Sequence, residues 1–183
     1  MNSHFNWIAR FYDRVLPFTR LEQMLNVLHL PSAGSLLDAG GGTGRVAEAL
    51  RPHVDWIMVA DVSREMLAQA RQKDLAAAST ATEHLPFPDG TFDRVLMVDA
   101  LHHVADQAET IRELYRVLKA GGRLVIEEPD VRTFSVKLIA LAEKLALMRS
   151  HFLAPPQIAR LFPSEARVRI ETEDYTAWVI AEK

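Results

Sequence analysis

The chain has 183 residues, of which 49% are hydrophobic and 25% charged, with a net charge of −3 and no cysteine. This size and composition predict one globular domain, 1–183, with a hydrophobic core. The lack of cysteine excludes disulfides, thiolate metal sites and cysteine nucleophiles, and the net charge argues against general electrostatic binding of nucleic acid.

Neither a targeting signal nor a membrane span is expected. No apolar run approaches the roughly 18 residues that cross a bilayer. The first residues also lack the basic-then-apolar pattern of a signal peptide. The prediction is therefore a cytoplasmic protein.

Residues 1–20 are predicted to form an N-terminal lid or cap. Apolar and aromatic side chains from Phe5 to Val15 fall near helical spacing, and Pro17 ends the segment. The segment would either pack on the domain or close over a ligand. A second amphipathic helix is predicted over Leu21–Leu30.

A glycine-rich turn follows the first predicted strand, Ser35–Ala39. Residues 38–44 read Asp-Ala-Gly-Gly-Gly-Thr-Gly, and a helix is predicted over Arg45–Leu50. Glycine permits positive φ and lets a ligand approach the backbone. The spacing fits neither the Gly-x-Gly-x-x-Gly dinucleotide pattern nor the Gly-Lys-Ser/Thr of a P-loop. A cofactor loop and an ordinary glycine-rich turn are both open at this point.

An acid ends the second predicted strand. Trp56–Ala60 is a continuous apolar run, typical of a strand buried on both faces, and Asp61 follows it. Such an acid can accept hydrogen bonds from two ribose hydroxyls, in nicotinamide enzymes as well as in others. Val62 could lie against a flat adenine, and Ser63 is a good N-cap for the next helix. The alternative is that Asp61 is an ordinary surface acid.

The fourth predicted strand brings more polar groups to the same edge of the sheet. A third strand is predicted over Ala76–Thr80 and the fourth over Arg94–Val98, followed by Asp99, His102 and His103. Ligands of open α/β sheets lie beyond the carboxyl ends of the strands. One imidazole could act as a general base near neutral pH, or the pair could be structural. Adjacent histidines do not share a helix face, so no metal site is expected.

The second half begins with a helix predicted over Gln107–Lys119, capped by Gly121 and Gly122, and a fifth strand over Arg123–Glu127. Three acids at the end of this strand are either solvated or face a substrate: Glu127, Glu128 and Asp130. A helical insertion is expected over 131–163. Its long helix is 133–148, Pro155–Pro156 break it, and a short helix follows at Gln157–Phe162. The long helix would form core, a substrate wall or a homodimer contact.

The last two predicted strands, Ala166–Ile170 and Tyr175–Ala181, are separated by only a few polar residues. Such a short connection predicts an antiparallel hairpin. A plain dinucleotide domain would need a crossover helix here, and the chain has no room for one.

In this order, the motifs resemble the class I S-adenosylmethionine (SAM)-dependent methyltransferases, in the small-molecule branch near ubiquinone and menaquinone biosynthesis. The resemblance covers about 35–183. It implies a three-layer, Rossmann-like α/β fold whose seven-stranded, mostly parallel sheet has an antiparallel last strand. It also implies SAM as cofactor, S-adenosylhomocysteine as product, and no metal. The cofactor-binding residues that it implies are Tyr12, Asp38, Ala39, Gly40, Gly41, Gly42, Gly44, Asp61, Val62, Met66, Thr82, Glu83, Asp99 and Leu101. The candidate catalytic base, from its place at the strand end and its imidazole chemistry, is His102 or His103.

The chain departs from the family pattern at Ala81, where the family has an aspartate beside the adenine. Thr82, Glu83 or the backbone would have to substitute. The Asp/Asn-Pro-Pro-aromatic motif of adenine-specific nucleic-acid enzymes is absent, which counts against that substrate. The expected acceptor is a small, apolar molecule. The alternatives are a SAM-binding protein without catalysis and, less favoured, a nicotinamide oxidoreductase.

Overall fold

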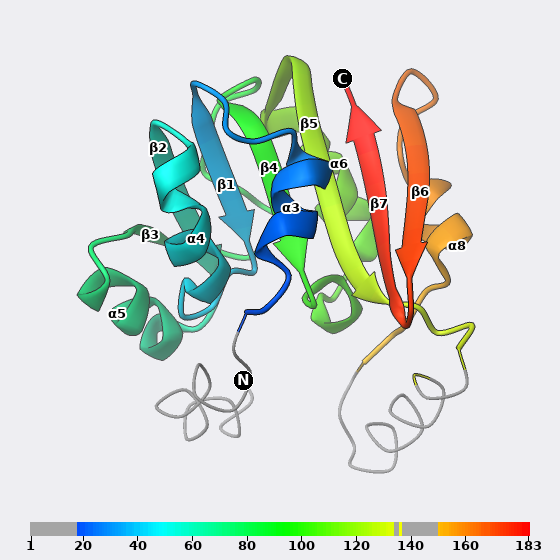
Figure 1. Cartoon of the computed structure of the whole chain (residues 1–183), viewed down its shortest axis with the longest axis horizontal. Helices are drawn as coiled ribbons and strands as arrows, with labels where there is room; N and C mark the ends of the chain where they lie inside the picture. Colours follow the sequence, from blue (N-terminus) through cyan, green and yellow to red (C-terminus); the bar gives the residue numbers. More distant parts are fainter. Residues whose placement is uncertain (1–17, 134–135, 137–149) are drawn as a thin grey trace.

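The structure is a computed structural model that describes residues 18–133, 136 and 150–183. A seven-stranded sheet forms its centre, in the order β3-β2-β1-β4-β5-β7-β6 (Figure 1). The strands are β1 (Ser35–Ala39), β2 (Trp56–Asp61), β3 (Ala76–Ser79), β4 (Phe92–Val98), β5 (Leu118–Pro129), β6 (Arg167–Glu173) and β7 (Thr176–Glu182). Strands β1 to β5 pair in parallel, whereas β7 runs antiparallel between β5 and β6.

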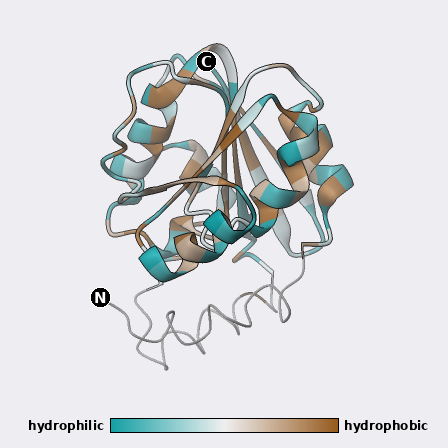
Figure 2. Ribbon diagram, turned by 90° about the vertical axis from the view of Figure 1, so that its left-hand side faces the viewer, coloured by the Kyte–Doolittle hydropathy of each residue, from teal (hydrophilic) through white to brown (hydrophobic). Residues whose placement is uncertain are grey.

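Helices cover both faces of the sheet, which gives three layers (Figure 2). The helices are α3 (Leu21–Leu28), α4 (Arg45–Leu50), α5 (Arg64–Gln72), α6 (Gln107–Val117) and α8 (Pro155–Ala159), with single 3₁₀ turns η2 (Arg51–His53) and η3 (Leu101–His103). Helices α3, α4 and α5 pack on one face, and α6 and α8 on the other.

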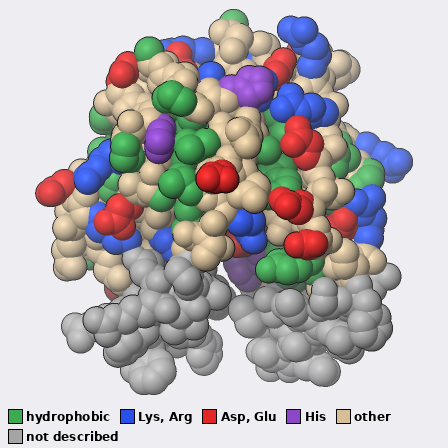
Figure 3. Space-filling view, viewed as in Figure 1, with side chains coloured by type: hydrophobic (Ala, Val, Ile, Leu, Met, Phe, Trp, Pro, Cys, Tyr) green, Lys and Arg blue, Asp and Glu red, His purple; other side chains and the backbone are tan. Residues whose placement is uncertain are grey.

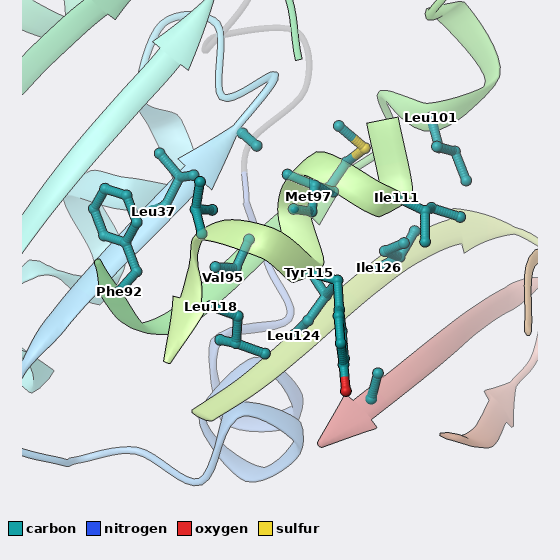
Figure 4. Packing of buried hydrophobic residues seen from close by; sticks show 14 of the residues in the cluster. Leu37, Phe92, Val95, Met97, Leu101, Ile111, Tyr115, Leu118, Leu124 and Ile126 are labelled. Carbon is teal, nitrogen blue, oxygen red and sulfur yellow. The ribbon is translucent and has the colours of Figure 1, made fainter. Parts of the chain in front are cut away.

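Alternating apolar side chains build one core on each face. Successive residues of a strand point to opposite faces. Leu36 and Leu96 accordingly join the core under α3 and α4, whereas Leu37, Val95 and Met97 join the core under α6 (Figure 4). The continuous apolar runs of the central strands are therefore explained by burial on both sides.

The terminal hairpin confirms the predicted fold class. Only Asp174 and Tyr175 connect β6 to β7. Strand β7 pairs with β5 in a register that sets Trp178 opposite Glu127. The three-layer fold with a mostly parallel sheet and an antiparallel last strand is thus as expected.

The predicted end of the helix before the fifth strand is wrong. Helix α6 ends at Val117 and does not reach a glycine cap at Gly121–Gly122. Both glycines belong to β5, because the Gly121 amide donates to the Lys183 carbonyl and the Lys183 amide donates to the Gly122 carbonyl. This pairing with the last residue of the chain draws the segment into the sheet.

The bounds predicted for the short helix after the two prolines are corrected. Pro155 and Pro156 form its first residues, and the helix, α8, ends at Ala159, not at Phe162. Proline suits the first helical turn because the amides there lack intrahelical acceptors. The predicted cap 1–20, apart from its last three residues, and most of the apolar helix 133–148 lie outside the described residues.

Among the described residues, no helix combines the length and apolar character needed to cross a bilayer. Positive and negative side chains are interspersed over the face shown in Figure 3.

Candidate functional site

The glycine loop lies at the carboxyl end of β1, between β2 and β4. Gly40, Gly42 and Gly44 have φ values of +70°, +54° and +71°, which side chains other than glycine adopt at a cost. An added Cβ on Gly40 would lie 2.7 Å from the Ala100 Cβ. The Gly40 amide donates to the Ala60 carbonyl at 2.7 Å. The loop is therefore a close-packed backbone turn that requires glycine.

Asp38 is buried beneath this loop, with 1% of its surface exposed. Burial raises the pKa of its carboxyl to about 7, although the Ala47 amide donates to it. Its Oδ2 atom is buried and has no hydrogen-bond partner among the described residues. A buried acceptor without a partner is costly, and a cationic or N–H donor from a ligand would relieve that cost.

Asp61 connects the glycine loop to the next helix. Its Oδ2 accepts from the Gly42 amide at 2.9 Å, and its Oδ1 accepts from the Ser63 amide at 2.7 Å. Burial raises the pKa of this carboxyl. The Val62 amide also donates to this carboxylate, which still retains acceptor capacity for a hydroxyl group.

Two apolar side chains lie beside this junction. Val62 is 70% exposed, as a platform for a flat ring would be. Met66 is buried in the first turn of α5, and its Sδ would lie 3.1 Å from a Cβ on Gly42. The structure thus brings Gly42, Asp61, Val62 and Met66 together.

A pocket of about 490 Å³ lies between the loop after β3 and the start of α6. Its lining is Ala81, Glu83, His84, Ala105, Asp106 and Glu109. Glu83 accepts from the amides of Ala105 and Asp106, at 2.9 and 3.3 Å. Thr82 is buried, and its hydroxyl pairs with that of Thr110 at 3.2 Å. Of the two predicted adenine-side residues, Glu83 lines the pocket, whereas the Thr82 hydroxyl is engaged with α6.

The ends of β4 and β5 form an acidic group that includes Asp99. This residue has a φ of +50°, and its amide donates to the Glu127 carbonyl at 2.9 Å. Burial and the neighbouring carboxylates Glu127 and Glu128 raise the pKa of Asp99 to about 6. The Leu101 side chain is buried in the core, so only the backbone of this residue is available to contact a ligand.

The acids at the end of β5 are buried, which excludes the solvated one of the two alternatives; Glu127 and Glu128 lie within the strand, and Asp130 follows it. Glu127 accepts from the Trp178 indole at 2.6 Å and pairs with Arg20. Glu128 accepts from the Leu101 amide at 2.7 Å and contacts His102 Nδ1 at 2.6 Å. Asp130, also buried, pairs with the neighbouring Arg132 side chain at 2.6 Å, and this pairing lowers the Asp130 pKa.

The two histidines differ sharply in environment. His102 is 5% exposed, and its ring stacks on Phe152 at a centroid distance of 4.3 Å. His103 is exposed, and its Nδ1 lies 3.4 Å from the Ser150 hydroxyl. The predicted cofactor residue Tyr12 lies outside the described residues.

The sequence-based list of site residues omitted Arg20, Glu127 and Glu128. The two glutamates follow the fifth apolar run, at the same sheet edge as Asp61 and Asp99, and that position was the available signal. Arg20 had no such signal, because only the packing of α3 against β5 brings it to Glu127.

Comparisons with known proteins agree with this geometry. Residues 37–126 match the methyltransferase domain family. Demethylmenaquinone methyltransferase of Mycolicibacterium vanbaalenii is 34% identical over 155 residues, covering 81% of this chain and 67% of the relative. A ubiquinone/menaquinone biosynthesis C-methyltransferase of Escherichia coli O1:K1 is 32% identical over 143 residues, covering 72% of this chain and 55% of the relative. A SAM-dependent methyltransferase of Aquifex aeolicus shares the fold, with a TM-score of 0.74, 19% identity and coverage of 94% and 97%.

The sheet order, and the glycine loop with Asp61 and Asp99 at the ends of the two flanking strands, define a Rossmann-like domain built for a nucleoside-containing cofactor. With the sequence relatives, they show that the chain belongs to the class I SAM-dependent methyltransferases. It is an enzyme of that class, and SAM is its methyl donor.

Proposed function

We propose that this enzyme methylates a C, N or O atom of a small, largely apolar molecule, with a quinone-type ring as the first acceptor class to assay. The relatives named for demethylmenaquinone and ubiquinone/menaquinone support this choice of acceptor. The net charge of −3 supports a small molecule over a nucleic acid.

The buried Asp38 Oδ2, which has no hydrogen-bond partner in the part of the chain that the structure describes, is the observation that best supports the binding mode. Asp38 and the backbone of Gly40–Gly42 would hold the amino-acid portion of SAM. Asp61 would accept the two ribose hydroxyls. Val62, Met66 and the Ala81–Glu83 segment would enclose the adenine, and the backbone at Asp99–Leu101 would complete the wall.

The cofactor supplies a methyl group already activated by a positively charged sulfur, so the protein needs no covalent intermediate. The protein's contribution is to hold the acceptor atom in line with that methyl group and to exclude water.

The binding mode is tested by calorimetric titration of SAM and S-adenosylhomocysteine into the wild type and an Asp61→Ala variant. Loss of charge-assisted hydrogen bonds to the ribose should weaken binding by about 10- to 100-fold. Asp55→Ala is the matched control, because Asp55 also accepts a backbone amide, that of Gly34 at 2.8 Å, but at the opposite end of β2. Equal losses in both variants, or no binding by the wild type, would refute the binding mode.

The acceptor class is tested by incubating the enzyme with SAM and a reduced, demethylated menaquinone, and following the product by mass spectrometry. Methylation of that ring supports the quinone-type proposal. Turnover of other small molecules only, from a panel of phenols, amines and carbon acids, would refute the quinone assignment while leaving the binding mode intact.

A further inference from the structure

A buried carboxylate, Glu128, holds both the backbone and the ring of the short turn that follows β4. Its Oε1 accepts from the Leu101 amide at 2.7 Å, and its Oε2 lies 2.6 Å from His102 Nδ1. The side chains of Glu128 and His102 are 4% and 7% exposed. This clamp spans from β5 to η3 at the carboxyl edge of the sheet, where ligands of such folds bind.

The hydrogen bonds of Glu128 indicate where the His102 proton lies. A backbone amide can only donate, so Glu128 Oε1 is an acceptor. We assign the imidazole proton to Nδ1, because an ionised carboxylate accepts hydrogen bonds through both oxygens. The assignment makes Nε2 the basic nitrogen of the neutral ring.

Packing also restricts the orientation of the ring. Phe152 stacks on it with an interplanar angle of 13°, and the His102 carbonyl accepts from the His151 amide at 2.8 Å. The His103 ring lies 4.0 Å away, centroid to centroid. A base held on several sides needs little reorganisation before it reacts.

The charges around the ring favour the imidazolium that would form when Nε2 takes up a proton. Strand β4 contributes Asp99 at its end, β5 contributes Glu127 and Glu128, and Arg20 precedes α3. The titratable neighbours on the adjoining segments are His103 and His151. Among the described residues named here, carboxylates outnumber the arginine, and a carboxylate near an imidazole favours its positive form.

We propose that Glu128 is a positioning residue that fixes His102 in its Nδ1–H form, so that Nε2 removes a proton from the acceptor as the acceptor is methylated. This proposal rests on the proposed function. The acceptor's O–H or C–H bond breaks, and its proton goes to Nε2. The electron pair left on oxygen or carbon forms the bond to the methyl carbon, and the pair of the methyl–sulfur bond returns to sulfur. His102 then releases its proton to solvent.

The proposal narrows the substrate class. A neutral amine already has a lone pair and gains little from a base before transfer. A phenol, a hydroquinone or an activated carbon acid must lose a proton. A built base therefore indicates an acceptor with an ionisable O–H or C–H bond rather than an amine.

The first test needs neither cofactor nor acceptor. Long-range ¹H–¹⁵N spectra of the uniformly labelled wild type report which imidazole nitrogen carries the proton, and a His102→Gln variant assigns the signals. The proposal expects the proton on Nδ1. In Glu128→Gln, the amide keeps an oxygen for the Leu101 amide and turns its NH₂ toward Nδ1, which should reverse the tautomer. A wild-type proton on Nε2 would overturn the proposal.

The second test separates positioning from a merely structural role. Glu128→Gln should lower kcat by about 10²- to 10⁴-fold, the range for a lost general base, while SAM affinity and acceptor KM stay near wild type. Glu165→Gln, an exposed carboxylate ahead of β6, is the matched control. A reversed tautomer with unchanged kcat would overturn the base role. Failure of the wild type to bind SAM would instead refute the proposed function, and the tautomer measurement would still stand.

Discussion

Replacing Asp38 by asparagine should change how stability depends on pH. Burial raises the pKa of this carboxyl from 3.8 to about 7 in the folded protein. Below pH 3.8 the group is protonated in both the folded and unfolded states and costs nothing. As pH rises, the unfolded chain loses the proton first, so the penalty on the folded state grows until the pH passes about 7 and is constant above that.

The size of this penalty follows from the shift. At about 1.4 kcal/mol per pKa unit, the full cost is about 4 kcal/mol at pH 8, but only about 1.5 kcal/mol at pH 5. Asparagine removes the titration and adds a roughly pH-independent cost for a buried amide. Relative to wild type, the variant should therefore gain about 3 kcal/mol between pH 5 and pH 8, or roughly 6–12 °C in Tm.

The assay is urea or thermal unfolding of the cofactor-free protein at both pH values. Asp74→Asn, an exposed carboxylate in the loop between α5 and β3, is the matched control. For each variant, stability at pH 5 is subtracted from stability at pH 8, because the pH-independent cost of the buried amide cancels in that difference. Identical pH dependence in Asp38→Asn and wild type would refute the reasoning. Asp38→Asn should also bind SAM more weakly, because the ammonium group proposed to contact this side chain would then face a neutral amide and not a carboxylate.

Two further substitutions, each with a control variant, test the packing that supports the site. Gly44→Ala should lower the free energy of unfolding by about 2–5 kcal/mol, because it combines a φ of +71° with a Cβ 2.5 Å from Leu75 Cδ1. Its control, Gly121→Ala, has a φ of +77° but nothing within 4 Å of the added Cβ, and should cost only about 1–2 kcal/mol in urea unfolding. Equal losses would mean that backbone strain alone decides both. Glu127→Ala should cost about 3–5 kcal/mol, because it leaves a buried indole and a guanidinium without their acceptor. Glu171→Ala breaks an exposed ion pair and should cost less than about 1 kcal/mol, and a similar loss in both variants would contradict this account.

The sequence predicted the first half of the sheet well because its signals there are local. The bounds of β1, Ser35–Ala39, were as expected, and Ser63 caps α5 by accepting from the Met66 amide at 3.2 Å. An apolar run, a glycine turn and an N-cap are each read within a few residues. The edge at which Asp61 and Asp99 meet followed from the parallel topology.

The errors lie where distant segments determine the outcome. Helix α6 ends early because Gly121 and Gly122 pair with the last residue of the chain, which no local pattern reveals. The Thr82 hydroxyl pairs with Thr110 on α6, which again no local pattern reveals, and the adenine-side role of Thr82 stays a prediction. The cofactor role of Tyr12 stays a prediction.

The sequence alone determined the fold class and the glycine loop, because apolar periodicity and turn chemistry are properties of neighbouring residues. The cofactor followed from the resemblance of the ordered motifs to the SAM-dependent methyltransferases. Only the tertiary structure decided that Glu127 and Glu128 are buried and which partner each one has. Those partners, Arg20, Trp178 and His102, are 107, 51 and 26 residues away in the chain. A carboxylate is buried only when folding delivers donors to it, and that delivery depends on how α3, β7 and η3 pack around β5.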